Sequence, residues 1–220
     1  MTSSPDNLTI GKGKAYFRSF GGVVVLKWVT LTEYSAGAVV MLADGTLIKT
    51  TAGGTSGASE PTATLGVYGT DGDIDDWVEV PWVDFGNCPS FKVNGEYETL
   101  EHFSDRTPIK TRDKKVILTR KGSLGITLDE MTKENLMLAL MGKDSSGKVK
   151  IFGETQVYGQ VKLEQTNEVG NKFNWFFGNV SFIPGKEIEV IGNSWMTVEI
   201  TGEVNMDANG EFGTLSEPTP

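Results

Sequence analysis

The side chains best suited to chemistry are four closely spaced aspartates. Asp71, Asp73, Asp75 and Asp76 stand in the sequence DGDIDD, which begins like a calcium-binding loop. Such a loop needs a glycine at its sixth position and a glutamate at its twelfth, but those positions hold Asp76 and Trp82. The segment therefore predicts a turn rather than a metal site.

The other chemically versatile residues are too few for catalysis. The chain has one cysteine, Cys88, and one histidine, His102, so it can form neither an internal disulfide nor a Cys/His metal site. The glycines of GKGK (11–14) lack the strand–loop–helix context of a phosphate site. No pair of carboxylates has a context that raises a pKa, as glycosidase chemistry requires. We expect no enzymatic activity, no metal and no cofactor.

Aromatic residues between positions 28 and 77 have two interpretations. Trp28, Tyr34, Tyr68 and Trp77 could form a platform that contacts a glycan. They could equally form the core of a small module, which needs its aromatic side chains inside. The core interpretation is favoured.

Charge is distributed unevenly along the 220 residues, which carry a net charge of −9. Residues 28–81 contain one basic and eight acidic residues, and residues 122–220 contain seven basic and fourteen acidic residues. Residues 105–121 contain seven basic and two acidic residues, a net charge of +5. This polarity indicates either self-assembly through complementary surfaces or an anionic partner for the basic segment.

The hydrophobic pattern predicts a mainly β fold. Residues 154–164 and 197–206 alternate with period two, which is typical of strands with one dry and one wet face. Residues 132–141 predict one helix, with Thr132 as N-cap, Gly142 as the C′ stop and an apolar stripe. That stripe comprises Leu136, Met137, Leu140 and Met141. Further strands are predicted at 14–20, 91–101, 114–120, 173–182 and 186–191.

Differences in residue composition along the chain indicate two domains. Residues 53–76 are small, polar and rich in turn formers, unlike the segments on either side. We therefore expect a small β module at 27–82, inserted into a discontinuous β domain made of residues 1–26 and 83–220. No secretory signal and no apolar run long enough to cross a bilayer is visible, so the sequence predicts a protein kept in a reducing compartment.

Two sets of motifs resemble phage virion proteins. FGNCPSF (85–91), ETLEHFS (98–104), KKVILTR (114–120) and ITLDEMTKENLMLALMG (126–142) follow one another in the order found in major tail tube proteins of long-tailed bacteriophages. LTIGKGKAYF (8–17) resembles their opening strand. Separately, W-x5-Y-x2-G (28–37), AGGTSGASEPT (52–62) and DG-x4-W (71–77) are similar to a carbohydrate-binding-like module that recurs in phage virion proteins.

The first resemblance implies a tail-tube-type β-sandwich or barrel with one flanking helix. It implies hexameric rings that stack into a tube, assembled in the host bacterial cytoplasm, through which double-stranded DNA leaves the capsid. Implied partners are further copies of the chain and the tail tip or baseplate, tape measure and tail terminator proteins, with no membrane insertion. The second resemblance leaves an alternative, a virion decoration or adhesin that binds host glycans through the module.

Geometry is consistent with a shared tube wall. A barrel of about eight strands is filled by its own side chains, so one chain of this length cannot enclose duplex DNA and several copies must lend strands. An acidic wall would repel DNA and let it slide. The wet strand faces supply candidates for that wall: Glu154, Glu164, Glu199 and Glu203.

The basic segment has three interpretations. A nucleic-acid patch should interleave aromatic residues, and none lies between Phe103 and Ile126. A solvated hairpin remains open. We favour contact with a neighbouring subunit, for which the candidates are Arg106, Lys110, Arg112, Lys114 and Lys115.

Overall fold

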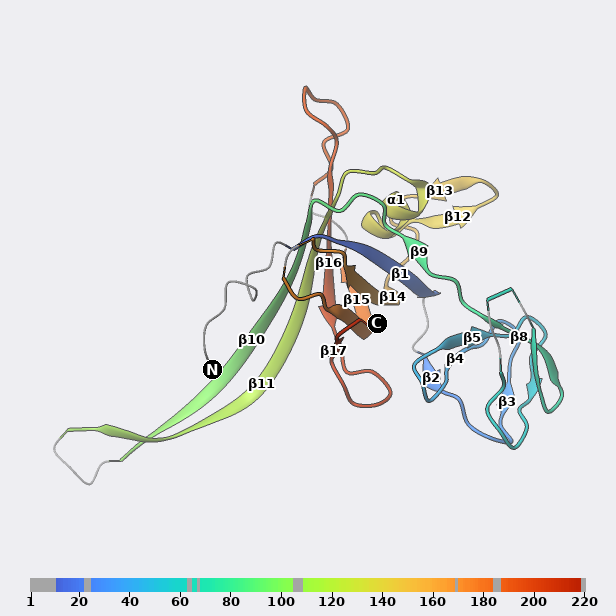
Figure 1. Cartoon of the computed structure of the whole chain (residues 1–220), viewed down its shortest axis with the longest axis horizontal. Coiled ribbons are helices and arrows are strands. Elements are labelled where there is room, and N and C mark those ends of the chain that lie inside the picture. Colours follow the sequence, from blue (N-terminus) through green and yellow to red (C-terminus); the bar gives the residue numbers. More distant parts are fainter. Residues whose placement is uncertain are drawn as a thin grey trace.

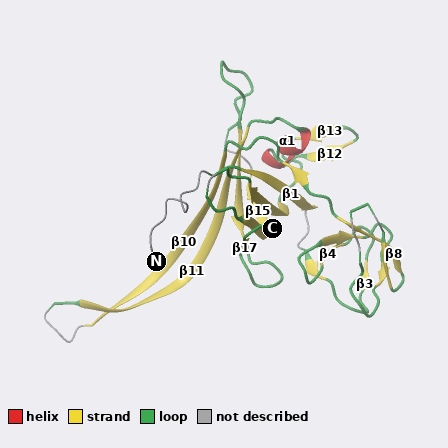
Figure 2. Cartoon of the chain, viewed as in Figure 1, coloured by secondary structure: helices red, strands yellow, loops and turns green. Residues whose placement is uncertain are grey.

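The structure is a computed structural model that describes residues 11–21, 25–62, 65–66, 68–104, 109–168, 170–183 and 187–218. It is mainly β with one helix in the described residues, which confirms the fold class. Figure 1 shows a curved central sheet, a long ribbon that leaves it on one side, and a small β module on the other. Figure 2 shows that strands and loops account for nearly everything except α1.

The central sheet has eight antiparallel strands in the order β10-β11-β16-β15-β14-β1-β9, and β17 pairs with β15 outside this path. Its strands are β1 (Gly13–Gly21), β9 (Val83–Asp84), β10 (Ser90–Ser104), β11 (Thr111–Leu128), β14 (Val157–Gln165), β15 (Asn174–Ile183), β16 (Val198–Val204) and β17 (Thr214–Ser216). A short hairpin, β12 (Lys143–Ser145) and β13 (Lys148–Lys150), follows the helix.

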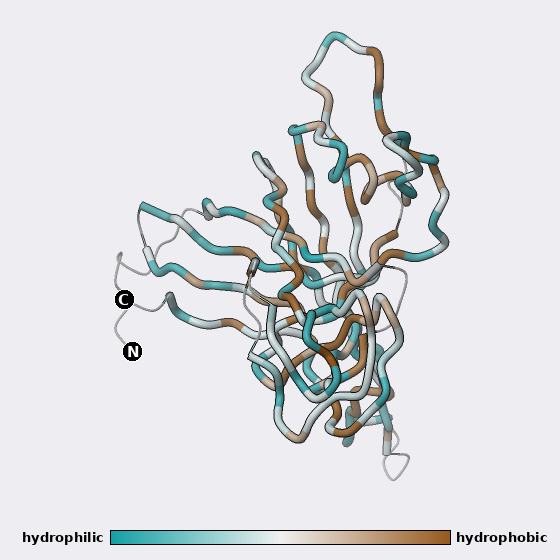
Figure 3. The backbone as a smooth tube through the Cα atoms, turned by 90° about the vertical axis from the view of Figure 1, so that its right-hand side faces the viewer, coloured by the Kyte–Doolittle hydropathy of each residue, from teal (hydrophilic) through white to brown (hydrophobic). Residues whose placement is uncertain are grey.

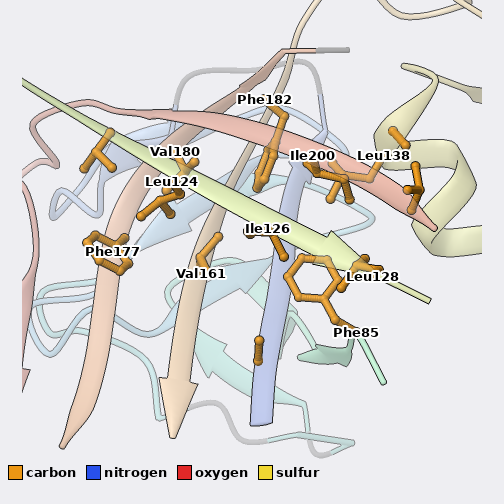
Figure 4. Packing of buried hydrophobic residues seen from close by; sticks show 14 residues of the cluster. Phe85, Leu124, Ile126, Leu128, Leu138, Val161, Phe177, Val180, Phe182 and Ile200 are labelled. Atoms are coloured by element: carbon orange, nitrogen blue, oxygen red, sulfur yellow. The ribbon is translucent and has the colours of Figure 1, made fainter. Parts of the chain in front are cut away.

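The core fills the concave face of this sheet. β16 alternates strictly between buried and exposed residues, and its buried Val198 and Ile200 stand opposite Leu128 and Ile126 of β11. In Figure 4, β11 crosses in front of β14 and β1, and aliphatic and aromatic side chains occupy the space between them. Period-two patterning therefore buries one face of each strand, as the alternation of 197–206 predicts. Met206, placed on that buried face by the sequence, is 53% exposed because β16 ends at Val204.

The single helix, α1 (Lys133–Ala139), confirms the predicted helix and its N-cap. The Thr132 side chain accepts a hydrogen bond from the backbone N–H of Asn135 at 3.1 Å. The predicted C-terminus is displaced by one residue: Met141, at φ 47°, takes the left-handed position, and the Gly142 N–H donates to the Met137 carbonyl at 2.6 Å. Gly142 is required for space, because a Cβ there would lie 2.5 Å from Val149.

The buried face of α1 differs from the predicted stripe. Asn135, Leu138 and Ala139 are buried. Of the predicted stripe, Met141 is also buried, just after the helix, whereas Leu136, Met137 and Leu140 are half-buried. The reason is a polar contact: the Asn135 side-chain amide donates to the carbonyls of Phe85 and Glu130 at 2.9 and 2.8 Å. This pair of bonds turns the helix so that a polar residue faces the sheet.

Two strand predictions need correction. The strand predicted at 154–164 is observed as Val157–Gln165, so Glu154 precedes it. The strand predicted at 186–191 is not one, because residues 187–197 form an irregular loop between β15 and β16. Pairing rather than composition decides these cases, since neither segment has a neighbouring strand to bond.

Residues 26–80 form sheets of their own. β2 (Leu26–Lys27), β4 (Val39–Met41), β5 (Leu47–Lys49), β8 (Ile74–Glu79) and β7 (Gly69–Asp71) form one sheet in that order, and β3 (Glu33–Tyr34) pairs with β6 (Gly54–Thr55). Trp77 is completely buried in this module, with Ile48 and Ile74 packed around it. This is the region in which the sequence predicts a module at 27–82.

The module packs against the convex face of the central sheet, at the end formed by β1 and β14. Gln160 of β14 is completely buried there, and its side-chain amide donates to the Gly45 carbonyl at 3.1 Å. The Arg18 guanidinium lies 4.2 Å from the Trp82 ring centroid and 3.4 Å from the Glu79 carboxylate. Burial lowers the pKa of Arg18 to about 10, an effect that Glu79 opposes.

Candidate interaction surfaces

Both margins of the central sheet are open in the described chain. β10 pairs with β11, and no other described strand pairs with its second edge. At the opposite margin, β9 pairs with β1 only over Tyr16 and Phe17. The two margins do not pair with each other, and the sheet is therefore not a closed barrel. Free strand edges present rows of backbone donors and acceptors that another chain can pair with.

The most prominent surface is the ribbon formed by β10 and β11 beyond the sheet. β16 pairs with β11 only from Gly122 to Leu128, whereas β10 and β11 continue to pair as far as Ser104 and Thr111. We call residues 96–104 and 109–121 the arm. Nine residues of strand span roughly 30 Å, and Figure 1 shows this ribbon projecting well away from the body. Its two register shifts, at Glu98/Thr99 and His102/Phe103, are of the kind that strengthens twist.

The arm exposes an unusual amount of apolar surface. Leu100 and Val116 stand directly opposite each other on one face and are 60% and 43% exposed. The other exposed apolar residues of the arm are Tyr97, Phe103, Ile109, Ile117 and Leu118. An isolated two-stranded ribbon is marginally stable in water, and a dense group of exposed apolar side chains marks an interaction site. The arm therefore has the properties of a segment that packs against another molecule.

The predicted basic candidates lie at the far end of the arm. Arg112 forms an ion pair with Glu101 at 2.7 Å, and Lys115 lies 3.7 Å from the same carboxylate. Lys114 stands opposite His102, and Lys110 is exposed just before β11. Part of the positive charge is thus neutralised within the arm. Arg106 lies outside the described residues.

The four acidic candidates do not share one surface. Glu199 and Glu203 are exposed on β16, on the convex face of the sheet. Glu164 lies on the same face but ion-pairs with Lys162 at 2.8 Å. Glu154 lies in the irregular segment before β14 and contacts Lys143 at 3.3 Å, so its predicted place on a strand face is wrong.

The wet face predicted for 154–164 is only partly wet. It carries Gln160, which is completely buried beneath the module, and Tyr158, which packs against the cluster of Met41 and Leu47. The sequence could not show this because a polar side chain looks the same whether water or a covalently attached module covers it. Other parts of this convex face remain exposed or partly exposed, among them Glu199 and Glu203 on β16 and Glu164 on β14.

The four aromatic residues of the module follow the favoured core interpretation more than the alternative of an exposed platform, since Trp28 and Tyr34 pack against the cluster that contains Trp77. Trp77 is completely buried and meets Tyr34 edge to face at 5.6 Å, so glycan contact by Trp77 is wrong. The Tyr34 hydroxyl accepts a hydrogen bond from the Val29 N–H at 2.7 Å. Trp28 is half-buried and donates from Nε1 to Asp71 at 3.0 Å. Tyr68 is 65% exposed, which leaves a single open aromatic ring.

The aspartates of DGDIDD point to structural partners. Asp71 accepts hydrogen bonds from the Gly57 N–H at 2.6 Å and from Trp28. Asp76 accepts from the hydroxyls of Thr50 and Thr51 and from the backbone N–H of Ala52 at 2.9 Å. These bonds, first those from the two threonines, lower the pKa of Asp76 far below its ordinary value. Within the described residues, no group of His, Cys, Asp and Glu side chains could hold a metal ion.

The sequence patterns did not predict two features of the surface. One is the exposure of Val116, Ile117 and Leu118. These three apolar residues follow one another between charged residues, a pattern that fits neither a buried strand nor an alternating one and that could have indicated an exposed apolar segment. The other is the loop 187–197, where Ile191 and Trp195 are 92% and 93% exposed. Figure 3 shows hydrophobic residues along the strands of the sheet and again on the loop at the top. No described helix is long and apolar enough to cross a membrane.

A comparison with protein-family models finds a family that covers part of the chain. A family described as "Protein of unknown function UCP028589" matches residues 77–162, which is less than half of the chain. The matched segment runs from β8 through the arm and α1 into β14. No curated protein matches the sequence.

Proposed function

We propose that the protein is a structural subunit that assembles with copies of itself into hexameric rings, and that the rings stack into the tail tube of a long-tailed bacteriophage. The tube conducts double-stranded DNA during ejection. The proposal rests on the family resemblance of the sequence together with one structural observation, the arm. A ribbon with exposed apolar side chains on both faces and a free β10 edge supports a role in contact between subunits.

The open sheet supports the same proposal. Eight strands in an open sheet cannot enclose a channel for duplex DNA, so a conduit requires several copies. The margins of the sheet at β10 and β9, which no further described strand covers, are of the kind that lets copies continue one sheet into the next. The exposed Glu199 and Glu203 are the members of the acidic set best placed to face DNA.

Electron microscopy of the purified chain at increasing concentration tests this function. We expect rings about one subunit thick, and tubes at the highest concentrations. The matched control replaces residues 96–121 by Asn-Gly, which joins the opposed Gly95 and Gly122 through a two-residue hairpin turn. This control should fold and remain monomeric. A wild-type chain that stays monomeric at all concentrations would contradict the proposal. Glycan binding on an array that is lost in Tyr68→Ala would then favour the adhesin.

A further inference from the structure

A groove lies at the base of the arm, on the concave side of the sheet. β11 pairs with β16 only from Gly122 to Leu128, and β17 pairs with β15 rather than with β11. A gap therefore separates β11 from β17. The gap holds a mainly apolar groove of about 460 Å³, with Tyr97, Trp175 and Phe212 among its lining residues. The buried Nε1 of Trp175 has no hydrogen-bond partner within the described structure. A buried donor of this kind is expected to meet an acceptor.

The rim of the groove is basic. Arg120 and Lys121 are exposed there, and neither takes part in an ion pair in the described part of the chain. This distinguishes them from Arg112 and Lys115 farther along the arm, which share Glu101. The groove thus combines an apolar floor with two basic residues at its edge, of which Lys121 stands opposite Glu96 and Arg120 stands opposite the uncharged Tyr97. It fits an occupant that is apolar and acidic.

The loop 187–197 has the complementary composition. It contains Glu187 and Glu189 and no basic residue, and both glutamates are exposed. Ile188 packs against the main core and anchors the loop, whereas Val190, Ile191 and Trp195 extend away from the body, the first of them 76% exposed. Apolar side chains held out in this way on an anchored loop lose contact with water only when another molecule covers them.

The loop and the groove lie at opposite ends of the same strand. β16 begins at Val198, directly after the loop, and ends at Val204, which lines the groove. Seven residues of strand separate them by roughly 20 Å, so the loop of one chain does not reach the groove of the same chain. Figure 1 shows the loop at the top of the molecule and the arm leaving at the lower left.

We infer that the loop 187–197 of one copy docks in the groove between the arm and β17 of a second copy. Trp195 and Ile191 enter the apolar groove, Glu187 and Glu189 face Arg120 and Lys121, and a loop acceptor meets the Trp175 N–H. Because the two surfaces differ, the contact is head to tail and repeats from copy to copy. The inference rests on the proposed self-assembly and names the two surfaces that carry it.

Charge reversal in the full-length chain tests this pairing. Arg120→Glu with Lys121→Glu, and separately Glu187→Lys with Glu189→Lys, should each raise the concentration needed for assembly about 30-fold or more. Mixing the two variants should restore assembly, because every contact in an alternating array again joins opposite charges. Lys148→Glu with Lys150→Glu makes the same charge change on an exposed hairpin and should assemble like the wild type.

Cross-linking supplies the second measurement. In a Cys88→Ser background, Ser194→Cys in one copy and Asn94→Cys in a differently tagged copy should form a disulfide under assembly conditions, because both positions flank the proposed contact and leave Trp195 and Tyr97 in place. Trp195→Phe should assemble nearly as well as the wild type and Trp195→Ser should not. Assembly without this cross-link, or assembly unchanged in both charge variants, would overturn the inference while leaving the proposed tube intact. A wild-type chain that never assembles would overturn both.

Discussion

The two ends of the central sheet differ in the kind of side chain that they bury and expose. At the β1–β14 end, Arg18 and Gln160 are almost completely buried, and the module supplies Glu79 and the Gly45 carbonyl as their partners. At the β10–β11 end, Leu100 and Ile117 are more than half exposed. One end buries polar groups and the other exposes apolar ones, within a single sheet.

The two ends differ in whether another part of the same chain covers them. The module is part of the same chain, so its docking is completed on folding. It supplies Glu79 and the Gly45 carbonyl as partners for the buried Arg18 and Gln160, while Arg18 Nε and Gln160 Oε1 have no hydrogen-bond partner in the described structure. The arm has no covering element among the described residues, and its apolar surface is available for another molecule. This difference is consistent with the proposed role of the arm in association.

The largest expected effect is a loss of self-association caused by substitutions in the arm that leave the stability of the monomer unchanged. Leu100→Ser with Val116→Ser removes an opposed apolar pair and should weaken self-association at least about 100-fold, because buried interface anchors dominate binding. The free energy of unfolding of the monomer should change by less than about 0.5 kcal/mol, since both side chains are exposed. Sedimentation and urea unfolding measure the two quantities. Leu26→Ser, at another exposed position, is the control for added polarity.

The opposite result is expected at the module interface. Arg18→Ala should lower the free energy of unfolding by about 2–4 kcal/mol, because it removes the cation above Trp82 and leaves Glu79 without its partner. Arg18→Met combined with Glu79→Gln should cost clearly less, since no charge is left unpaired. Association through the arm should be unaffected in both variants. Equal costs for the single and double variants would show that the ion pair is not what holds this interface.

A smaller effect, with a defined pH dependence, is expected inside the module. Asp76→Asn should cost about 1–2 kcal/mol at neutral pH, because Asn cannot accept all the bonds from Thr50, Thr51 and Ala52. The folded pKa of Asp76 lies below its ordinary 3.8, so its contribution is complete above that value and is lost as the pH falls further. The difference between wild type and variant, measured by urea unfolding, should therefore shrink below about pH 4. A difference that grows on acidification would contradict this role.

The smallest structural effect is expected on β16. Glu199→Lys with Glu203→Lys alters exposed side chains and should change stability by less than about 0.5 kcal/mol. In assembled tubes, the new lysines should contact phosphates, strengthen DNA retention and make it more dependent on salt. Tubes that assemble normally and release DNA at the wild-type rate would remove these glutamates from the conduit wall.

Local patterns predicted much of the fold. The alternation in 197–206, the Thr132 cap and the strands around 14–20 and 173–182 appear in the structure because each depends on residues that are close in sequence. The predictions failed where a distant contact decided the outcome. The side chain of Asn135 is buried where it donates to the Phe85 carbonyl, and residues 187–191 form no strand because no described strand pairs with them.

The candidate sites were less predictable than the elements. The sequence located the basic segment, but the pairing of Arg112 with Glu101 depends on a register that includes two irregularities. It grouped Glu154 with Glu199 because both follow an alternating pattern, yet only Glu199 lies on a strand. It named Trp77 as either glycan contact or core, and burial decided for the core.

By itself, the sequence determined the mainly β class, the single capped helix and the uneven charge, since these follow from periodicity, capping residues and composition. The tertiary structure alone decided which polar face the module covers, how far β10 and β11 extend beyond β16, and where the acidic loop lies relative to the basic groove. Those features depend on contacts between residues far apart along the chain, and no local pattern records them.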